Sequence, residues 1–494
     1  METKEQYKDC ILFYRLGDFY EMFFDDALVA SKELEITLTG KSCGLEERAP
    51  MCGIPYHAVE GYLSKLVSRG YKVAICEQVE DPKLAKGLVK REVIRVVTPG
   101  TNLNVQSLEA GKNNYLLSIA YTPDGIGISA ADVTTGDYYV TEVEDLKKLN
   151  DELMKYEPSE IICNEAFLVS GFDVNDLKSR LHISVNALES HMFDDDGCRR
   201  ILMRHFKVNT LIGLGVEEFP TGILAAGALL QYLYDTQKTD LEHFTHISPY
   251  LTSKYMLLDS STRRNLELTE TLREKQKRGS LLWVLDKTKT AMGGRLLRNY
   301  IEQPLIDKEE MEKRLDAIQE LNQDSISRDE IREYLNPVYD LERLLSKVTY
   351  KTANPRDLIA FRNSLQMLPP IKTVLAGFQK EELAAIREEI DGLEDIYQLI
   401  DEAIVEEPPI SIREGGMIKD QFDETIDHLR AAKHDGKQWL VQLEEEDRER
   451  TGIKNLKIKK NNVFGYFFEV TNSYKDLVPE DYIRKQTLTN AERY

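Results

Sequence analysis

The first hundred residues alternate between short apolar runs and turn residues, a pattern that predicts a mixed α/β module. The runs 73–76 and 93–97 predict strands, whereas residues 23–38 have the spacing of an amphipathic helix. Residues 62–70 predict a second helix that ends at its final glycine, since glycine is favoured just beyond helix C-termini. We expect this module to span residues 1–105.

A second α/β module follows a polar linker at 102–114. The pattern predicts, in order, strands at 115–121, 126–133 and 138–143, a helix over about 144–156, a strand at 161–162 and a buried helix over 222–234. Turn residues join the first three strands, which indicates an antiparallel meander. We expect this module to end near residue 237.

From about residue 250 to 450 the apolar positions recur every three or four residues, which predicts long amphipathic helices. One such series runs through Leu383, Ile386, Ile390, Leu393, Tyr397, Ile400 and Ile404, and a second through Ile418, Phe422, Ile426 and Leu429. The period becomes two over 453–470, which predicts a β-hairpin that turns at Asn461 and Asn462. On its second strand, Phe464, Tyr466, Phe468 and Val470 are expected to line one face.

Chain length and composition indicate the number of domains and the net charge. A chain of 494 residues contains three or four domains at the usual domain size. Its net charge of −21 lowers the expectation of nucleic-acid binding, because a polyanion repels a polyanion. Residues 448–467 nevertheless hold six Lys or Arg against one acid. A local basic stretch can contact phosphates on a chain that is acidic overall.

Cellular context is predicted from the cysteines, the N-terminus and the longest apolar stretch. The six cysteines lack CxxC spacing, which favours free thiols in a reducing cytosol, and the eight histidines show no metal-ligand spacing. The charged N-terminus is not that of a signal peptide. The longest apolar stretch, 222–230, is far shorter than the roughly 20 residues that cross a bilayer. We expect a cytoplasmic protein and no membrane.

Two motifs suggest chemistry that their surroundings do not support. Gly40-Lys41-Ser42 resembles the end of a phosphate-binding loop, but the position that requires glycine is Glu35, a carboxylate that would repel phosphate. Asp132 could belong to a metal-dependent nuclease, which needs several carboxylates around its metals. No others can be assembled by spacing, so an exposed aspartate at a strand end is the favoured interpretation.

The basic stretch and one aromatic cluster are candidate DNA contacts. Lys457 and Lys459 share a face of the predicted hairpin, and the candidate phosphate contacts are Lys454, Lys457, Lys459, Lys460, Asn461 and Asn462. A solvated charged hairpin is an equally good interpretation from spacing alone. In segment 15–23, Phe19 and Glu21 are two residues apart, so they point the same way if the chain is extended. An apolar wedge beside a carboxylate could probe a base step.

Eight motifs carry a resemblance to a known family. They are GDFYE at 17–21, APMCGIPYHA at 49–58, AICEQ at 74–78, VTPGT at 97–101, ADVTTG at 131–136, RNLEL at 264–268, GGRLL at 293–297 and QTLTNAERY at 486–494. In this order they are similar to those of the bacterial MutS family of DNA mismatch-recognition proteins.

The resemblance implies a multidomain α/β plus α architecture. Its expected parts are a mixed α/β mismatch-binding domain (1–105), a ribonuclease-H-like connector (112–237), an incomplete helical core and lever domain (248–429), a small β-rich clamp inserted between lever helices (430–485) and the start of a return into the core (486–494). The family's C-terminal ATPase domain would follow that return. We therefore expect no catalytic residue, metal or cofactor in this chain, whereas ATP and Mg²⁺ are implied for the intact protein, a DNA-dependent ATPase.

The resemblance also implies roles for individual residues. Phe19 would wedge into the minor groove at a mispaired step, with Leu16 packed beside it and Asp18 shaping the turn. Glu21 would hydrogen-bond the displaced base, and the negative potential of the phosphates favours a protonated carboxyl that donates. The clamp would hold the DNA backbone. The implied partners are double-stranded DNA with mismatches or small loops, a second copy in a homodimer, and a MutL-type repair protein.

Three alternatives make different predictions. A MutS paralogue outside repair would lack the Phe-x-Glu motif or the whole first domain, and both are present here. A helical scaffold that binds proteins predicts no change in DNA affinity on Phe19→Ala. A nuclease centred on Asp132 predicts Mg²⁺-dependent DNA cleavage.

Overall fold

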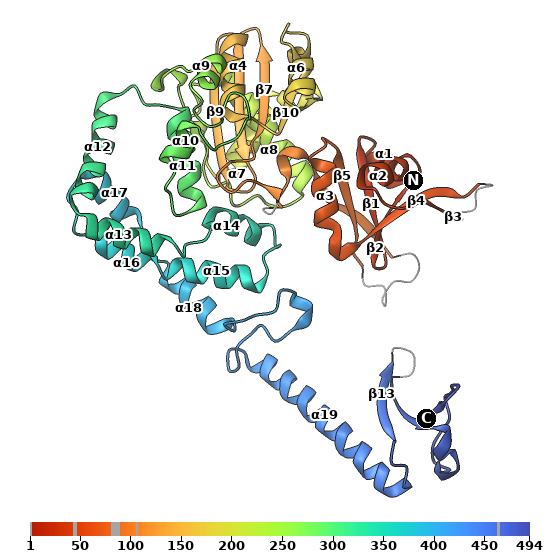
Figure 1. Cartoon of the computed structure of the whole chain (residues 1–494). Coiled ribbons are helices and arrows are strands. Elements are labelled where there is room, and N and C mark those ends of the chain that lie inside the picture. The colour runs from red at the N-terminus through yellow and green to blue at the C-terminus, as the bar shows by residue number, and fades with distance from the viewer. Residues whose placement is uncertain (1, 43–46, 81–88, 105–106, 462–464) are drawn as a thin grey trace. The chain divides into compact units, whose positions relative to one another are not determined.

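The structure, a computed structural model, describes residues 2–42, 47–80, 89–104, 107–461 and 465–494. The chain divides into two compact units, Met1–Gln398 and Leu399–Tyr494. The first unit contains two six-stranded sheets and a series of helices, and the second contains a long helix and a four-stranded sheet (Figure 1). No helix among the described residues combines the length and the apolar character needed to cross a membrane.

The N-terminal sheet has the strand order β3-β4-β2-β1-β5-β6. Its elements are α1 (Glu2–Gln6), β1 (Cys10–Leu16), β2 (Phe19–Phe23), α2 (Phe24–Leu34), β3 (Thr39–Lys41), β4 (Ala49–Pro55), α3 (Val59–Val67), β5 (Lys72–Gln78) and β6 (Arg91–Val97). β1 and β5 run parallel, and the other neighbours are antiparallel. Alternation along β2 buries Tyr20 and Met22 in a core with Phe13 and Ile54, against α2 and α3.

The predicted helices of this module differ from the observed helices in their bounds. The helix expected over 23–38 ends at Leu34, because Glu35 adopts a left-handed conformation with φ of 57° and donates its N–H to Ser31. The helix expected over 62–70 occupies Val59–Val67, and Gly70 takes its positive φ of 85° three residues beyond the end. Glycine therefore marks the turn after the helix instead of its last residue.

The second sheet has the order β11-β10-β7-β8-β9-β12. Its elements are β7 (Leu116–Thr122), β8 (Gly125–Asp132), β9 (Asp137–Val143), α4 (Leu146–Tyr156), β10 (Glu160–Asn164), α5 (Glu165–Leu168), α6 (Val174–Arg180), β11 (Ser184–Leu188), α7 (Asp195–His205), α8 (Pro220–Gln237) and β12 (Ser248–Pro249). The predicted meander is confirmed: β7, β8 and β9 pair antiparallel, and β10 then runs parallel to β7.

Helices cover both faces of this second sheet. α4 packs on one face, where Leu149 and Leu153 join the core, and α7 and α8 pack on the other. Gly127 on β8 allows the close approach of α8, since a Cβ there would lie 1.9 Å from the carbonyl oxygen of Thr221. The predicted buried helix is confirmed as α8, which is apolar on nearly every side.

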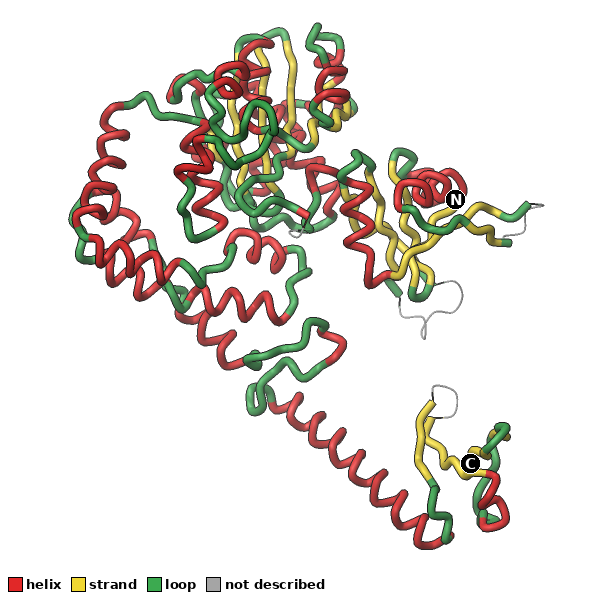
Figure 2. Tube along the Cα trace, in the orientation of Figure 1, coloured by secondary structure: helices red, strands yellow, loops and turns green. Residues whose placement is uncertain are grey.

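Helices and their connecting loops make up almost all of the chain between 260 and 403 (Figure 2). They are α9 (Ser260–Asn265), α10 (Leu281–Leu285), α11 (Ala291–Glu302), α12 (Lys308–Gln323), α13 (Ser325–Leu335), α14 (Leu341–Thr349), α15 (Pro355–Leu365), α16 (Leu368–Leu375), α17 (Glu381–Glu389) and α18 (Glu394–Ala403). The single helix implied by the series from Leu383 to Ile404 is wrong. It is broken between α17 and α18, where Asp391 accepts a hydrogen bond from the N–H of Leu393, which has a positive φ of 45°.

The C-terminal unit consists of one long helix and a small sheet of order β13-β14-β16-β15. Its elements are α19 (Glu424–Thr451), β13 (Lys457–Asn461), β14 (Gly465–Thr471), β15 (Gln486–Thr487) and β16 (Ala491–Arg493). The helix begins at Glu424 and not at Ile418, because Asp423 caps it by accepting from the N–H of Ile426 at 2.9 Å. Ile418 instead forms an isolated bridge with Ile404.

One expectation about this sheet needs correction. Residues 486–494 do not leave it: β16 pairs with both β14 and β15, so these residues form part of the sheet. On β14, Phe468 and Val470 belong to the same apolar cluster, whereas Phe467 is buried under the guanidinium of Arg493, 4.7 Å from the ring centroid, and Tyr466 is 56% exposed. Phe464 lies outside the described residues.

Candidate nucleic-acid interface

Phe19 lies at the start of β2, immediately after a tight turn that follows β1. Gly17 has a φ of 60°, which glycine adopts without strain, and Asp18 is exposed at the turn. The backbone carbonyl of Asp18 accepts a hydrogen bond from the N–H of Tyr56 at 3.0 Å, which ties the turn to the end of β4. Phe19 is 48% exposed. A rigid turn thus presents an aromatic ring to solvent.

Glu21 lies on the same face of β2 as Phe19. The buried residue between them, Tyr20, points to the core, as the period of two requires. Cross-strand register aligns Leu16 with Phe19 and Gly53 with Glu21. A Cβ at Gly53 would lie 3.6 Å from Glu21 Cγ and 3.9 Å from Phe19 Cδ1. The glycine therefore leaves open the space between the ring and the carboxylate.

A polar network supports the strands beneath this face. The guanidinium of Arg15 lies 3.9 Å from the ring centroid of Tyr56 and donates to Glu77 at 3.2 Å. Tyr20 also donates to Glu77, and burial together with this hydrogen bond raises the pKa of the Tyr20 phenol. Arg91 donates to the carbonyl of Arg15 at 2.8 Å. Because each of these groups is held by a partner, the face that carries Phe19 and Glu21 is preorganised.

Glu21 itself has a cationic partner that the sequence interpretation did not assign. The ammonium of Lys41, on the edge strand β3, lies 2.5 Å from Glu21 Oε2. Lys41 belongs to the Gly40-Lys41-Ser42 stretch, which forms an antiparallel strand with β4 and not the loop before a helix that a phosphate-binding motif requires.

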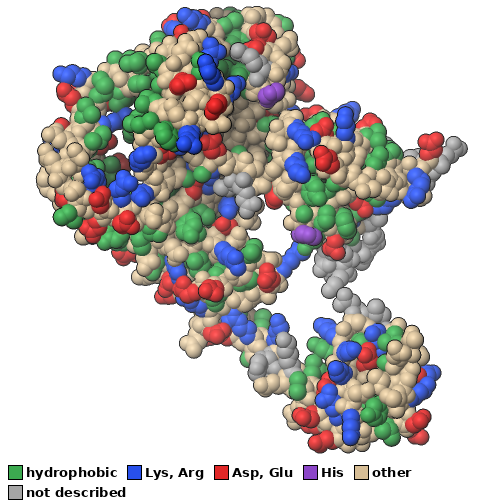
Figure 3. All heavy atoms as spheres, in the orientation of Figure 1, with side chains coloured by type: hydrophobic (Ala, Val, Ile, Leu, Met, Phe, Trp, Pro, Cys, Tyr) green, Lys and Arg blue, Asp and Glu red, His purple; other side chains and the backbone are tan. Residues whose placement is uncertain are grey.

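The candidate backbone contacts lie on or before the hairpin of the C-terminal unit. Lys457, Lys459, Lys460 and Asn461 belong to β13, and Lys454 precedes that strand. The side chains of Lys454, Lys457 and Lys460 are exposed. Figure 3 shows basic side chains spread over the visible face of this small sheet, at its lower right. Asn462 lies outside the described residues.

These lysines differ in how freely they can contact a ligand. Lys459 pairs with Glu469 at 2.6 Å, and the ammonium of Lys460 lies 5.3 Å from the ring centroid of Tyr466. Lys457 forms no ion pair with any residue that the structure describes. Lys457 and Lys460 are therefore the more available cations of the strand.

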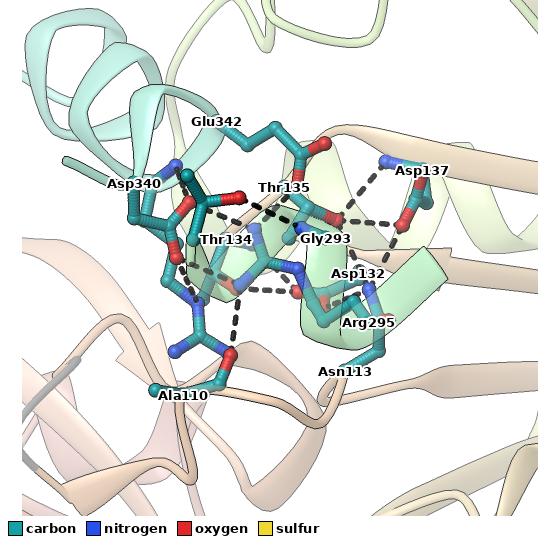
Figure 4. A network of polar contacts seen from close by, with 12 residues as sticks. Ala110, Asn113, Asp132, Thr134, Thr135, Asp137, Gly293, Arg295, Asp340 and Glu342 are labelled. Carbon is teal, nitrogen blue, oxygen red and sulfur yellow. Dashed lines mark hydrogen bonds and ion pairs between the residues drawn. The ribbon is translucent and has the colours of Figure 1, made fainter. Parts of the chain in front are cut away.

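Asp132 is not the exposed strand-end residue that the sequence favoured. Its side chain is fully buried and accepts four hydrogen bonds of 2.7–2.9 Å, from Asn113 Nδ2, the N–H of Asn114, and the N–H and hydroxyl of Thr134 (Figure 4). These donors satisfy the carboxylate. The part of the chain that the structure describes contains no group of three or more His, Cys, Asp or Glu that could hold a metal.

The same network joins the segment before β7 to the helical part of the unit. Arg295 donates to both oxygens of Asp340 at 2.7 Å, to Glu342 at 2.5 Å and to the carbonyl of Ala110 at 3.0 Å (Figure 4). Its side chain is almost fully buried. The sequence GGRLL at 293–297 signalled this arginine only through the family resemblance.

The comparisons with known proteins decide the family. Three sequence-family models match the chain: MutS domain I over residues 1–106, MutS domain II over 114–247 and MutS domain III over 261–484. The chain belongs to the MutS family. Phe19, Glu21 and Lys41 lie within MutS domain I, Asp132 lies within MutS domain II, and the basic hairpin lies within MutS domain III.

Curated relatives named DNA mismatch repair protein MutS agree with this assignment. The protein from Lachnoclostridium phytofermentans is 66% identical over 494 residues, that from Ruminiclostridium cellulolyticum 54% over 497, and that from Acetivibrio thermocellus 52% over 499. Each alignment covers 100% of this chain but 53%, 57% and 57% of the respective relative. The chain thus spans a little over half the length of these relatives.

Proposed function

We propose that the chain recognises mispaired or looped duplex DNA, with Phe19 as the wedge and Glu21 as the hydrogen-bonding partner of the displaced base. One observation carries the proposal: MutS domain I presents an exposed phenylalanine on a rigid turn, with a carboxylate beside it on the same face. A minor-groove wedge unstacks a base step at a cost of about a few kcal/mol. A mispaired step is already poorly stacked, so deforming it costs less.

The basic hairpin complements the wedge as a contact to the DNA backbone. Phosphate contacts by Lys454, Lys457, Lys459 and Lys460, with amides at Asn461 and Asn462, would hold the duplex without selecting a sequence. The exposed ammonium groups of Lys457 and Lys460 support this clamp role. Leu16 would pack beside the wedge, which its alignment with Phe19 supports.

The other functional assignments are also part of the proposal. The antiparallel meander followed by parallel β10 and β11 supports a ribonuclease-H-like connector that positions the neighbouring domains. A second copy of the chain and a MutL-type protein are the proposed protein partners. ATP and Mg²⁺ are implied for the longer family protein; in this chain Gly40 and Lys41 lie in strand β3, and the described residues contain no cluster of metal-ligating side chains.

Binding to matched duplexes tests the proposal. Fluorescence anisotropy at fixed salt would compare a G·T duplex with its fully paired G·C counterpart. We expect the unsubstituted chain to prefer the mismatch, and Phe19→Ala to reduce the preference by roughly 5- to 150-fold, the range for losing one aromatic–base stack. Leu28, on α2 of the same domain, is also 48% exposed and provides the matched control Leu28→Ala. Equal affinity of the unsubstituted chain for both duplexes would contradict the proposal.

A further inference from the structure

The Lys41–Glu21 ion pair lies on the face that carries the proposed wedge. Lys41 reaches Glu21 from β3 across the intervening strand β4, and its ammonium is also 5.5 Å from the ring centroid of Phe23. Phe19, Glu21 and Phe23 occupy alternate positions of β2 and so share that face. The lysine is therefore part of the surface on which a wedged base step would lie.

The pair contributes little to folding. The Lys41 side chain is 42% exposed and that of Glu21 17%, and ion pairs with such access to water contribute little to the stability of a fold. DNA that covers this face would remove the water and bring phosphates close. The charge of Glu21 then matters far more, because electrostatic interactions strengthen as the local dielectric constant falls.

We infer that Lys41 is a positioning residue for mismatch recognition, the counter-ion that keeps the Glu21 carboxylate beside Phe19 when DNA covers the site. The inference rests on the proposed function and extends it to a residue outside the Phe-x-Glu motif. An ammonium at 2.5 Å offsets the carboxylate charge against the phosphates and fixes Oε2. Oε1 has no hydrogen-bond partner among the residues that the structure describes, and it would meet the displaced base. Lys41 acts on the base through Glu21, whose charged carboxylate would accept a hydrogen bond, in contrast to the protonated, donating carboxyl that the resemblance implied.

Lys41→Met tests this role because it keeps the length of the side chain and removes its charge. We expect the ratio of mismatch to homoduplex affinity to fall at least roughly tenfold, since Glu21 is left uncompensated where the duplex has excluded water. Lys41→Arg should retain most of the ratio. The melting temperature of the protein should hardly change, which separates positioning from a structural role.

A double-mutant cycle identifies Glu21 as the group through which Lys41 acts. In a Glu21→Gln background there is no charge to compensate, so Lys41→Met should no longer alter the affinity ratio. Lys72→Met is the matched control: it removes an ammonium paired with Asp9 at 2.9 Å, at the opposite end of β1 from the wedge.

Three outcomes would overturn the inference while leaving the proposed function intact. The first is an unchanged ratio in Lys41→Met. The second is an equal loss of affinity for both duplexes, which would make Lys41 a phosphate contact only. The third is the same loss of ratio in the Glu21→Gln background. If the unsubstituted chain shows no mismatch preference, the proposed function itself fails, and this inference with it.

Discussion

At the scale of single residues, the face that carries Phe19 and Glu21 depends on the space between these side chains as much as on the side chains themselves. Gly53 is the clearest case. Its position opposite Glu21 leaves no side chain between the carboxylate and the ring of Phe19. A Cβ there would also lie 3.3 Å from the carbonyl oxygen of Tyr20, a backbone atom that cannot easily move.

Gly53→Ala should therefore disturb recognition through the backbone of β2. We expect relief of the tight contact with the Tyr20 carbonyl to shift β2, and with it Glu21 and Phe19, and to lower the ratio of mismatch to homoduplex affinity severalfold, as measured by anisotropy. Gly61→Ala, on α3 of the same domain, places its Cβ in open space and should leave the ratio unchanged. Equal ratios in the two variants would show that the gap beside Gly53 is not needed.

At the scale of elements, periodicity predicted several of the helices and strands but not where each ends. The meander of the second sheet followed from apolar spacing together with the turn residues between its strands, and the buried helix α8 followed from its apolar run. The break between α17 and α18 did not, because Leu383 to Ile404 keeps a helical spacing across it. A local hydrogen bond from Leu393 to Asp391 overrides that spacing. Burial of Asp132 was missed because it depends on donors from the segment before β7.

Asp137, the first residue of β9, should make the stability of the chain depend on pH. Burial and the neighbouring Asp132 raise the pKa of Asp137 to about 6. The pKa of an aspartate in the unfolded chain is about 3.9, so the folded state holds the proton of Asp137 more tightly. The resulting stabilisation is fully present below about pH 4 and is lost as the pH rises through about 6. Asp137→Asn removes the titration. We expect the free energy of unfolding of the variant, relative to the unsubstituted chain, to be higher at about pH 7.5 than at about pH 4.5, by on the order of 2–3 kcal/mol.

Urea denaturation at the two pH values would measure this difference. Asp124→Asn, in the exposed turn between β7 and β8, is the control and should show the same relative stability at both. If the free energy of unfolding of Asp137→Asn differed from that of the unsubstituted chain by the same amount at both pH values, the assignment of the titration to Asp137 would be contradicted.

At the scale of the whole molecule, the proposed DNA binding has to be reconciled with a net charge of −21. The basic stretch 448–467 concentrates positive charge in one sheet and the end of one helix, so the contact can be local. Its period of two predicted the hairpin, which the pairing of β13 with β14 confirms. The sequence could not predict that Lys459 would be held by Glu469 or Glu21 by Lys41, because both contacts join residues on different strands.

The clamp proposal predicts a specific dependence on salt. Lys457→Gln and Lys460→Gln should each weaken binding to mismatched and paired duplexes equally, and each should reduce the slope of log affinity against log salt by about 1. Lys475 is held by Glu492 at 2.9 Å, and Lys475→Gln should leave the slope unchanged. A selective loss for the mismatched duplex would contradict a backbone role.

The central claim is that Phe19 enters the duplex at a mispaired step. The most direct measurement places 2-aminopurine, which fluoresces more strongly when unstacked, beside a G·T mismatch. Under saturating conditions, the account predicts that the unsubstituted chain increases this fluorescence on the mismatched duplex but not on the paired one, and that Phe19→Ala abolishes the increase. The same increase with Phe19→Ala would contradict the claim.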